Sequence, residues 1–246
     1  MKISIVSAAY NSAKTIRDTI ESVLSQDYPD KEYVVADGGS TDGTVEILKS
    51  YGDKIKWISE PDKGIYDAMS KGVKMATGDV IGIIGSDDFY ANNQVFKKVA
   101  AKMQKTGASS AYGDLQYVDN QQVTKIVRKW KSGEYSRENF LNGWMPPHVA
   151  FFLTKAAYDE FGDYDQSFRG SGDYELMLRM LYKHKIPSCY IPEVLTFMRT
   201  GGNSNGTLKS YWRSNMEDRR SWKINGLTPH WYTLLLKPLS KIGQFF

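Results

Sequence analysis

Two adjacent carboxylates, Asp87 and Asp88, follow an apolar segment at 80–84. Neighbouring carboxylates repel each other unless a cation or hydrogen-bond donors offset their charge. Mg²⁺ and Mn²⁺ prefer carboxylate and phosphate oxygens as ligands, so the pair fits a divalent cation site on a diphosphate. The same Ser-Asp-Asp sequence is also an ordinary turn or helix N-terminal cap, and both interpretations stay open at this point.

Another carboxylate, Asp37, begins the glycine-rich loop at 37–43. It can accept hydrogen bonds from a base or a ribose, and the glycines let a ligand approach the backbone closely. The alternative is a simple turn in which Thr41 and Asp42 cap the next helix. The loop lacks the lysine and spacing of a P-loop, and no GxGxxG motif follows the first apolar segment. ATP hydrolysis and dinucleotide binding are therefore disfavoured.

Asp173 lies at the start of a helix expected over 174–182. A carboxylate there is stabilised by the helix dipole and stays ionised, as a general base must be, although a purely structural role fits the same placement. His148 follows two prolines and could bind a metal, contact a phosphate or form a hydrogen bond inside the core.

Three further residues have two interpretations each. Lys63 and Arg199 could balance phosphate charge, but single cations are usually solvated surface groups. Tyr10 could stack on a base or pack beneath the first helix.

The first 88 residues alternate between apolar segments and helical patterns. Strands joined through helices form a mostly parallel sheet with helices on both faces, and such sheets bind ligands at the carboxyl ends of their strands. The polar groups after each strand are therefore expected to converge on one site. Strands are predicted at 3–6, 33–36, 56–59 and 80–84, and helices at 16–24, 45–48 and 65–75.

From about residue 109 the pattern is less regular, which indicates a partly antiparallel region that completes the site. A rigid loop is expected at 144–148 because consecutive prolines exclude a helix. Further strands are predicted at 111–114, 115–118 and 123–128, and the segment 151–153 is short and apolar.

The composition indicates a folded chain with one sizeable domain. The 246 residues are 41% hydrophobic and 24% charged, which excludes a disordered, collagenous or coiled-coil protein. Cys189 is the single cysteine, so an internal disulfide is excluded. One cysteine and three histidines are also too few to indicate a Cys/His zinc site. The sequence shows neither a secretory signal nor an apolar run of about 18 residues, so a cytoplasmic chain without a membrane span is expected.

The segment 209–246 is basic and aromatic. It holds seven Lys and Arg residues against Glu217 and Asp218, a charge of +5, whereas the rest of the chain sums to −1. This combination fits an anionic partner, either a membrane surface or a nucleic acid. A C-terminal helix that packs on the body through its aromatic side chains is the alternative. The tail carries Lys209, Arg213, Arg219, Arg220, Lys223, Lys237 and Lys241, with Tyr211, Trp212, Trp222, Trp231, Tyr232, Phe245 and Phe246.

Taken together, three segments resemble the family 2 glycosyltransferases with the GT-A fold, especially bacterial members that build surface polysaccharides and O-antigen repeats. The resemblance covers about residues 1–200 and implies a nucleotide-diphospho-sugar donor, Mn²⁺ or Mg²⁺, and inversion at the anomeric carbon. The segments are ISIVSAAYNSAKTIRDTIESVLSQDYPDKEYVVADGGSTDGT, EPDKGIYDAMSKGVKMATGDVIGIIGSDDFY and SGDYELMLRM.

The resemblance also implies roles for individual positions. Asp173 would be the catalytic base and Asp88 the metal ligand, and His148 and Arg199 are candidates for the acceptor side or a phosphate. The residues expected to bind the nucleotide sugar are Ala8 and Tyr10 at the uracil, Asp37 at the base or ribose, Lys63, and Asp87 near the ribose.

Three positions depart from the family pattern. Gly85 stands where the first carboxylate of the usual Leu-Asp-x-Asp-Asp segment would be, so the identity of the metal ligand is in question. Met69 stands where many members have an arginine, and Gly172 replaces the acidic residue before Asp173.

The expected protein is thus α/β with a GT-A, Rossmann-like central sheet, a smaller acceptor-side region and a helical tail. The predicted divisions are 1–208, with a nucleotide-sugar-binding half at 1–108 and an acceptor-side half at 109–208, and the tail 209–246. The expected activity is transfer of a hexose or N-acetylhexosamine from a UDP-sugar to a glycan or undecaprenyl-diphosphate-linked acceptor at the inner face of the cytoplasmic membrane. A non-catalytic nucleotide-sugar-binding module and a dinucleotide-dependent oxidoreductase are the alternatives, and nucleic-acid binding ranks last.

Overall fold

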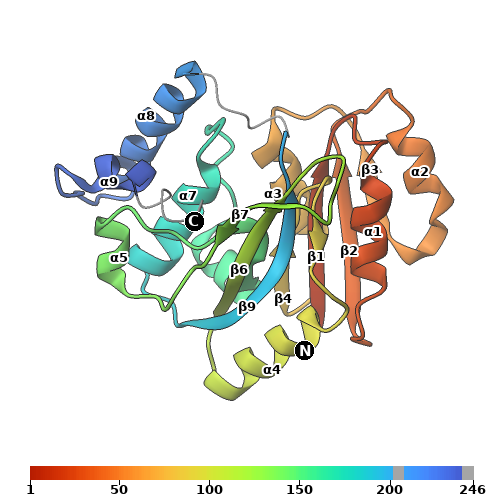
Figure 1. The fold of residues 1–246 in the computed structure, drawn as a ribbon, viewed down its shortest axis with the longest axis horizontal. Helices are drawn as coiled ribbons and strands as arrows, with labels where there is room; N and C mark the ends of the chain where they lie inside the picture. The colour runs from red at the N-terminus through yellow and green to blue at the C-terminus, as the bar shows by residue number, and fades with distance from the viewer. Residues whose placement is uncertain (202–207, 240–246) are drawn as a thin grey trace.

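The computed structural model of the chain describes residues 1–201 and 208–239. Their strands form one sheet of nine, ordered β3-β2-β1-β4-β8-β6-β9-β5, with β7 paired to β6. Helices lie on both sides of this sheet (Figure 1). Lys241, Phe245 and Phe246 of the predicted basic, aromatic tail lie outside the described residues, as do the side chains of Lys209 and Tyr211.

The first half of the chain is parallel, as predicted. β1 pairs in parallel with β2 on one side and β4 on the other, and β2 pairs in parallel with β3. The strands are β1 (Ile3–Ala9), β2 (Lys31–Asp37), β3 (Lys56–Ser59) and β4 (Val80–Ile83), and the helices between them are α1 (Ile16–Leu24), α2 (Thr44–Ser50) and α3 (Ile65–Met75).

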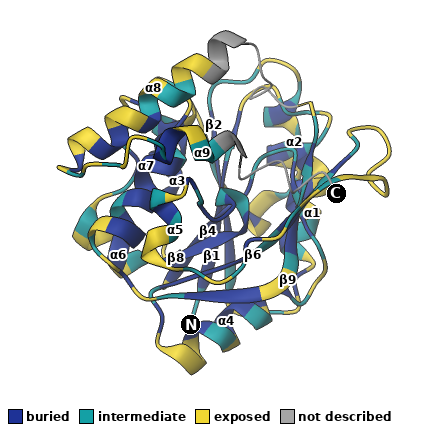
Figure 2. Ribbon diagram, turned by 60° about the vertical axis from the view of Figure 1, so that its left-hand side comes forward, coloured by how far each residue is buried: buried dark blue, intermediate teal, exposed yellow. Residues whose placement is uncertain are grey.

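The alternation of side chains along β1 divides the core into two layers. Ile3 and Ile5 pack in one layer with the apolar stripe of α1, whereas Val6 faces the other layer with Tyr66 and Met69 of α3. Both strand faces are covered, and Figure 2 shows the central strands buried. Met69 is itself a core residue, which accounts for the apolar side chain at this departure from the family pattern.

The second half adds antiparallel and mixed pairing. β8 pairs antiparallel with β4 and with β6, and β9 returns parallel to β6. The strands are β5 (Phe89–Tyr90), β6 (Ser110–Val118), β7 (Ile126–Trp130), β8 (Phe151–Thr154) and β9 (Ser188–Arg199). The helical elements are α4 (Val95–Thr106), α5 (Arg137–Leu141), the 3₁₀ turn His148–Ala150, α6 (Lys155–Phe161), α7 (Gly172–Met177) and the π-helical turn Leu178–Lys183.

Several elements differ from the sequence expectation. The two strands predicted at 111–114 and 115–118 are one strand, β6, whose pairing with β9 shifts register on both sides of Asp114. The helix predicted over 174–182 is α7 continued by the π-helical turn. The sequence analysis did not predict α4 or β9. α4 carries a readable apolar stripe at Val95, Phe96, Val99, Ala100 and Met103, whereas Pro192 and Glu193 interrupt the pattern of β9.

The C-terminal segment contains α8 (Leu208–Ile224) and α9 (Thr233–Leu239), and α8 packs on α7. Trp222 is 1% exposed and donates its indole N–H to the hydroxyl of Tyr174 at 2.9 Å. Trp212 and Trp231 are instead 73% and 85% exposed. Within the described residues, no helix combines the length and apolar character needed to cross a bilayer.

Candidate active site

The loops that carry the predicted residues leave the same edge of the sheet. β1, β2 and β4 are parallel neighbours, and their register places Ala9 beside Asp37 and Val6 beside Ile83. The loop after β4 touches the loop after β1, because the hydroxyls of Ser12 and Ser86 lie 2.8 Å apart. Ala8, Tyr10, Asp37 and the Asp87-Asp88 pair therefore emerge together at this edge.

Asp37 organises the glycine loop that follows β2. Its side chain is 2% exposed, and it accepts hydrogen bonds from the backbone N–H groups of Gly39 at 3.1 Å and Ser40 at 2.9 Å. The hydroxyl of Ser40 also donates to it, and the hydroxyl of Ser59 donates at 2.6 Å, which links β2 to β3. Asp42 accepts from the N–H and hydroxyl of Thr44, the first residue of α2, whose N-cap residue is Gly43.

Asp88 is buried and Asp87 is half-buried, and the charge of Arg199 only partly offsets their two negative charges. Asp88 is 1% exposed, and its Oδ1 accepts the backbone N–H of Arg199 at 3.2 Å. Burial, followed by the charge of Asp87, raises the pKa of Asp88 well above its usual range, and burial also raises the pKa of Asp87. A bound cation would relieve both effects, so the site fits a divalent metal.

Gly85 lets the two carboxylates converge. A Cβ atom at Gly85 would lie 2.6 Å from Oδ2 of Asp88 and 3.0 Å from Oδ1 of Asp87. The absence of a side chain at this position is therefore required by the conformation of the pair. Among the described residues, no group of three or more His, Cys, Asp or Glu side chains that could hold a metal ion occurs.

Arg199 lies behind this loop and is buried. Its guanidinium donates to the carbonyl of Asp87 at 2.6 Å, forms an ion pair with Asp18 and lies over the ring of Phe89. These contacts make Arg199 an anchor for the aspartate loop.

The loop after β3 connects the two sides of the site. Asp62 accepts the N–H of Gly64 at 2.8 Å and lies close to Gly38, beside the ring of Tyr10. Tyr10 is 58% exposed. The side chain of Lys63 is exposed, while its carbonyl accepts a hydrogen bond from the guanidinium of Arg169. The same short loop therefore reaches the glycine loop on one side and the segment before α7 on the other.

Asp173 lies on the first turn of α7 and meets the start of α3. The hydroxyl of Tyr66 donates to Oδ1 of Asp173 at 3.2 Å, and Oδ2 has no hydrogen-bond partner among the described residues. Burial, and then the charge of Asp173, raises the pKa of Tyr66 above its usual range, so Tyr66 remains a donor. The ring of Tyr66 lies against Gly172, where a Cβ would approach it to 2.9 Å. This contact explains why no acidic side chain precedes Asp173.

His148 is close to Asp173 but contacts another residue. Its Nε2 and the hydroxyl oxygen of Tyr164 are 2.6 Å apart, and the Tyr164 ring stacks on that of Tyr66. Burial lowers the pKa of His148, and the charge of Asp173 opposes that effect. The structure thus places His148 near Asp173.

The sequence analysis does not identify Tyr66 as a functional candidate. Its position could have indicated a functional role, because it lies at the start of the helix after the 60–64 loop, in the GIYDAM segment that carries part of the family resemblance. The predicted residues Tyr10, Asp37, Lys63, Asp87, Asp88 and Asp173 do lie on loops and helix ends that contact one another at one edge of the sheet.

Comparisons with known proteins identify the family of the chain. The family described as Glycosyl transferase family 2 matches residues 4–154. An uncharacterized glycosyltransferase of Mycobacterium tuberculosis is 29% identical over 180 residues, which cover 72% of this chain and 68% of that protein. The PGL/p-HBAD biosynthesis glycosyltransferase of Mycobacterium bovis is 27% identical over 208 residues, covering 82% of this chain and 78% of the relative.

Solved structures share the fold. A crystal structure of S. aureus TarS in complex with UDP-GlcNAc superposes with a TM-score of 0.69 at 18% identity, covering 92% of this chain and 70% of that one. The mannosyltransferase PcManGT from Pyrobaculum calidifontis, in complex with GDP-Man and Mn²⁺, gives a TM-score of 0.67 at 15% identity, covering 96% and 68%. The match to the family model spans more than half of the sequence, and the chain belongs to glycosyl transferase family 2.

Proposed function

We propose that this glycosyltransferase is a metal-dependent, inverting enzyme that moves a hexose or N-acetylhexosamine from a UDP-sugar to an acceptor hydroxyl. The observation that carries the proposal is the half-buried carboxylate of Asp173. Tyr66 occupies one of its oxygens and leaves the other for a substrate, at the edge where the Asp87-Asp88 pair also emerges.

The nucleotide is proposed to bind across the ends of β1 and β2. Ala8 and the exposed ring of Tyr10 would line the uracil, and Asp37 would act there through the loop that it shapes. Asp87 would lie near the ribose, and Lys63 has an exposed side chain able to meet a phosphate. The UDP-GlcNAc bound to TarS is consistent with a UDP-sugar donor.

Asp88, with Asp87 beside it, would hold the Mn²⁺ or Mg²⁺ that this proposal requires. When bound, the ion offsets charge on the diphosphate of the leaving group. The raised pKa values of both carboxylates and their convergence over Gly85 support this assignment.

Asp173 is the proposed general base. Its Oδ2 takes the proton of the acceptor hydroxyl while that oxygen forms a bond to the anomeric carbon, and the bond from that carbon to UDP breaks on the opposite face. An α-linked donor then gives a β-linked product. His148, beside Asp173, is on the proposed acceptor side, whereas the contacts of Arg199 favour support of the aspartate loop over direct acceptor binding.

The acceptor is proposed to be a glycan, free or linked to undecaprenyl diphosphate at the inner face of the cytoplasmic membrane. The exposed Trp212 and Trp231, in a segment that also exposes basic residues of α8, support a membrane-surface location.

The test is transfer from a panel of UDP-sugars with Mn²⁺, comparing the wild-type chain with Asp173→Asn. We expect Asp173→Asn to lower kcat by about 10²- to 10⁴-fold, because it removes the base, while calorimetry finds donor binding unchanged. Asp159→Asn, an exposed carboxylate change on α6, is the matched control. Near-normal turnover of Asp173→Asn, or an α-linked product by NMR, would contradict the mechanism.

A further inference from the structure

The C-terminal helix α8 holds the backbone immediately before Asp173. Glu217, on the side of α8 that faces α7, accepts hydrogen bonds from three consecutive backbone N–H groups. These residues lead into α7, whose N-cap is Ser171, and a negative charge is favourable near the amino end of a helix. The donors are the N–H groups of Arg169 at 3.0 Å to Oε1, and of Gly170 and Ser171, both at 2.8 Å to Oε2.

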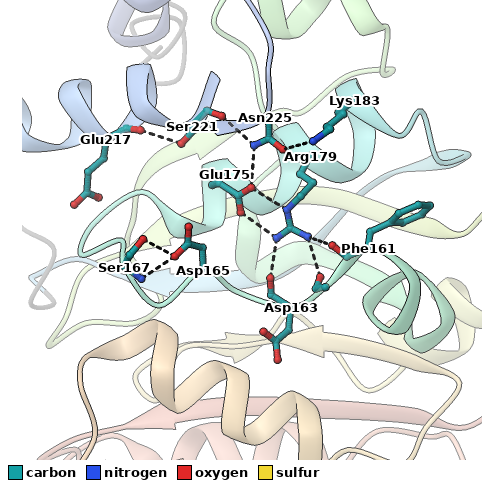
Figure 3. A network of polar contacts seen from close by, with 11 residues as sticks. Phe161, Asp163, Asp165, Ser167, Glu175, Arg179, Lys183, Glu217, Ser221 and Asn225 are labelled. Atoms are coloured by element: carbon teal, nitrogen blue, oxygen red, sulfur yellow. Dashed lines mark hydrogen bonds and ion pairs between the residues drawn. The ribbon is translucent and has the colours of Figure 1, made fainter. Parts of the chain in front are cut away.

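Trp222 of α8 and Asn225, which directly follows that helix, hold the residues immediately after Asp173. The indole of Trp222 donates to the hydroxyl of Tyr174, and the amide of Asn225 donates to Oε1 of Glu175 at 3.0 Å. Glu175 is in turn paired with Arg179, as Figure 3 shows. Asp173 thus lies between two sets of contacts that both come from the C-terminal segment.

The segment that Glu217 holds is also tied to the loop after β3. The guanidinium of Arg169 donates to the carbonyl of Lys63, three residues before Tyr66, and Tyr66 donates to Asp173. A shift of residues 169–171 would therefore change both the direction of Asp173 and its spacing from the loop proposed to meet the donor phosphates.

We infer that Glu217 is a positioning residue for Asp173, an inference that rests on the proposed role of Asp173 as base. Glu217 acts through the backbone of 169–171 and touches no substrate itself. A displacement of about 1 Å at a reacting group can lower a rate by about 10²-fold, so a loosened segment would lower kcat before it affects donor binding. The basic, aromatic tail therefore contributes to catalysis by positioning Asp173.

The experiment compares the full-length wild-type chain with Glu217→Gln and, as control, Glu160→Gln, the same chemical change at an exposed position on α6. The glutamine amide has one oxygen that can accept a hydrogen bond. Its NH₂ group is a donor and cannot accept from the backbone N–H groups. We expect kcat to fall by about 10-fold or more, with donor KM within about twofold and an unchanged melting temperature. Amide hydrogen exchange of 169–175 should become at least about 10-fold faster.

The measurements separate the possible failures. Unchanged exchange at 169–175 would overturn the inference whether or not the chain is active on the donors tried. Faster exchange with an unchanged kcat would also overturn it, as would a fall in kcat matched by losses of donor affinity and melting temperature. Turnover retained by Asp173→Asn in the same assay would instead refute the proposed base.

Discussion

At the scale of single residues, the contacts of Asp173 define how its carboxylate is presented. Tyr66 donates to one oxygen, and the Tyr66 ring is fixed between Gly172 and Tyr164. A hydrogen bond from a rigid donor selects one orientation of a carboxylate that could otherwise rotate. Tyr66 is thus part of the proposed active site, although it carries no charge.

Replacing Tyr66 by phenylalanine removes this hydrogen bond and keeps the ring. A bond of this kind contributes about 0.5–1.5 kcal/mol, so we expect kcat to fall by about 3- to 10-fold with donor KM unchanged. Tyr28→Phe removes a hydroxyl that donates to the carbonyl of Met1, away from Asp173, and serves as control. A kcat for Tyr66→Phe equal to that of the control would show that the bond does not orient the base.

At the scale of elements, the amino ends of the parallel strands are joined by one buried carboxylate, Glu32 on β2. It accepts from the hydroxyl of Ser4 on β1 at 2.6 Å and from the N–H of Thr77 at 2.9 Å, and it pairs with Lys56 on β3. Burial would raise the pKa of Glu32, but the hydrogen bonds from Lys56, Ser4 and Thr77 outweigh it and lower the pKa to about 2.

This network predicts a specific acid sensitivity of the folded sheet. Because the folded pKa of about 2 lies below the ordinary 4.5, the ionised Glu32 stabilises the fold above pH 4.5 and loses that contribution as the pH falls toward 2. Glu32→Gln should lower the free energy of unfolding at pH 7 by about 1–3 kcal/mol and flatten its decline between pH 4.5 and 2. Urea unfolding across this range checks it, with Glu46→Gln on α2 as control, and parallel curves for both variants would contradict it.

At the scale of the whole molecule, part of the C-terminal segment packs on the body and part of it stays exposed. Trp222 and Leu234 are buried against the body, so part of the tail packs as a structural element. Trp212, Met216, Trp231 and Leu235 remain more than half exposed, beside the exposed Arg213, Arg219 and Lys223. The division at residue 208 stays a proposal, and the contacts of α8 with α7 link its two sides.

Exposed aromatic and basic side chains predict binding to anionic lipid. We expect the full chain to sediment with phosphatidylglycerol vesicles more than with phosphatidylcholine vesicles, and less at high salt, because basic residues contribute about 1 kcal/mol each near such a surface. The double substitution Trp231→Ser and Leu235→Ser should reduce binding several-fold. Ile126→Ser, at an exposed position of β7, is the control, and equal sedimentation of both variants would reject the lipid contact.

The parallel half of the fold could be predicted because its signals are local. The stripe of α1 and the apolar strands before the polar loops are each contained within about ten residues, and the structure reproduces them closely. β9 was not predicted, because its pairing with β6 depends on residues some 80 positions away and its own pattern is broken by Pro192. Tyr66 and Asp173 are 107 positions apart, so no periodicity could reveal their contact.

The sequence by itself determined the parallel strand-helix order, the polar groups at the strand ends and the similarity to a glycosyltransferase family, since side-chain type and short spacing encode these features. Tertiary structure alone decided which oxygen of Asp173 accepts from Tyr66, why Gly85 and Gly172 carry no side chain, and that Glu217 holds the segment before α7. Those features depend on contacts between segments that are distant in the chain. Packing in three dimensions determines such contacts, and a local sequence pattern does not reveal them.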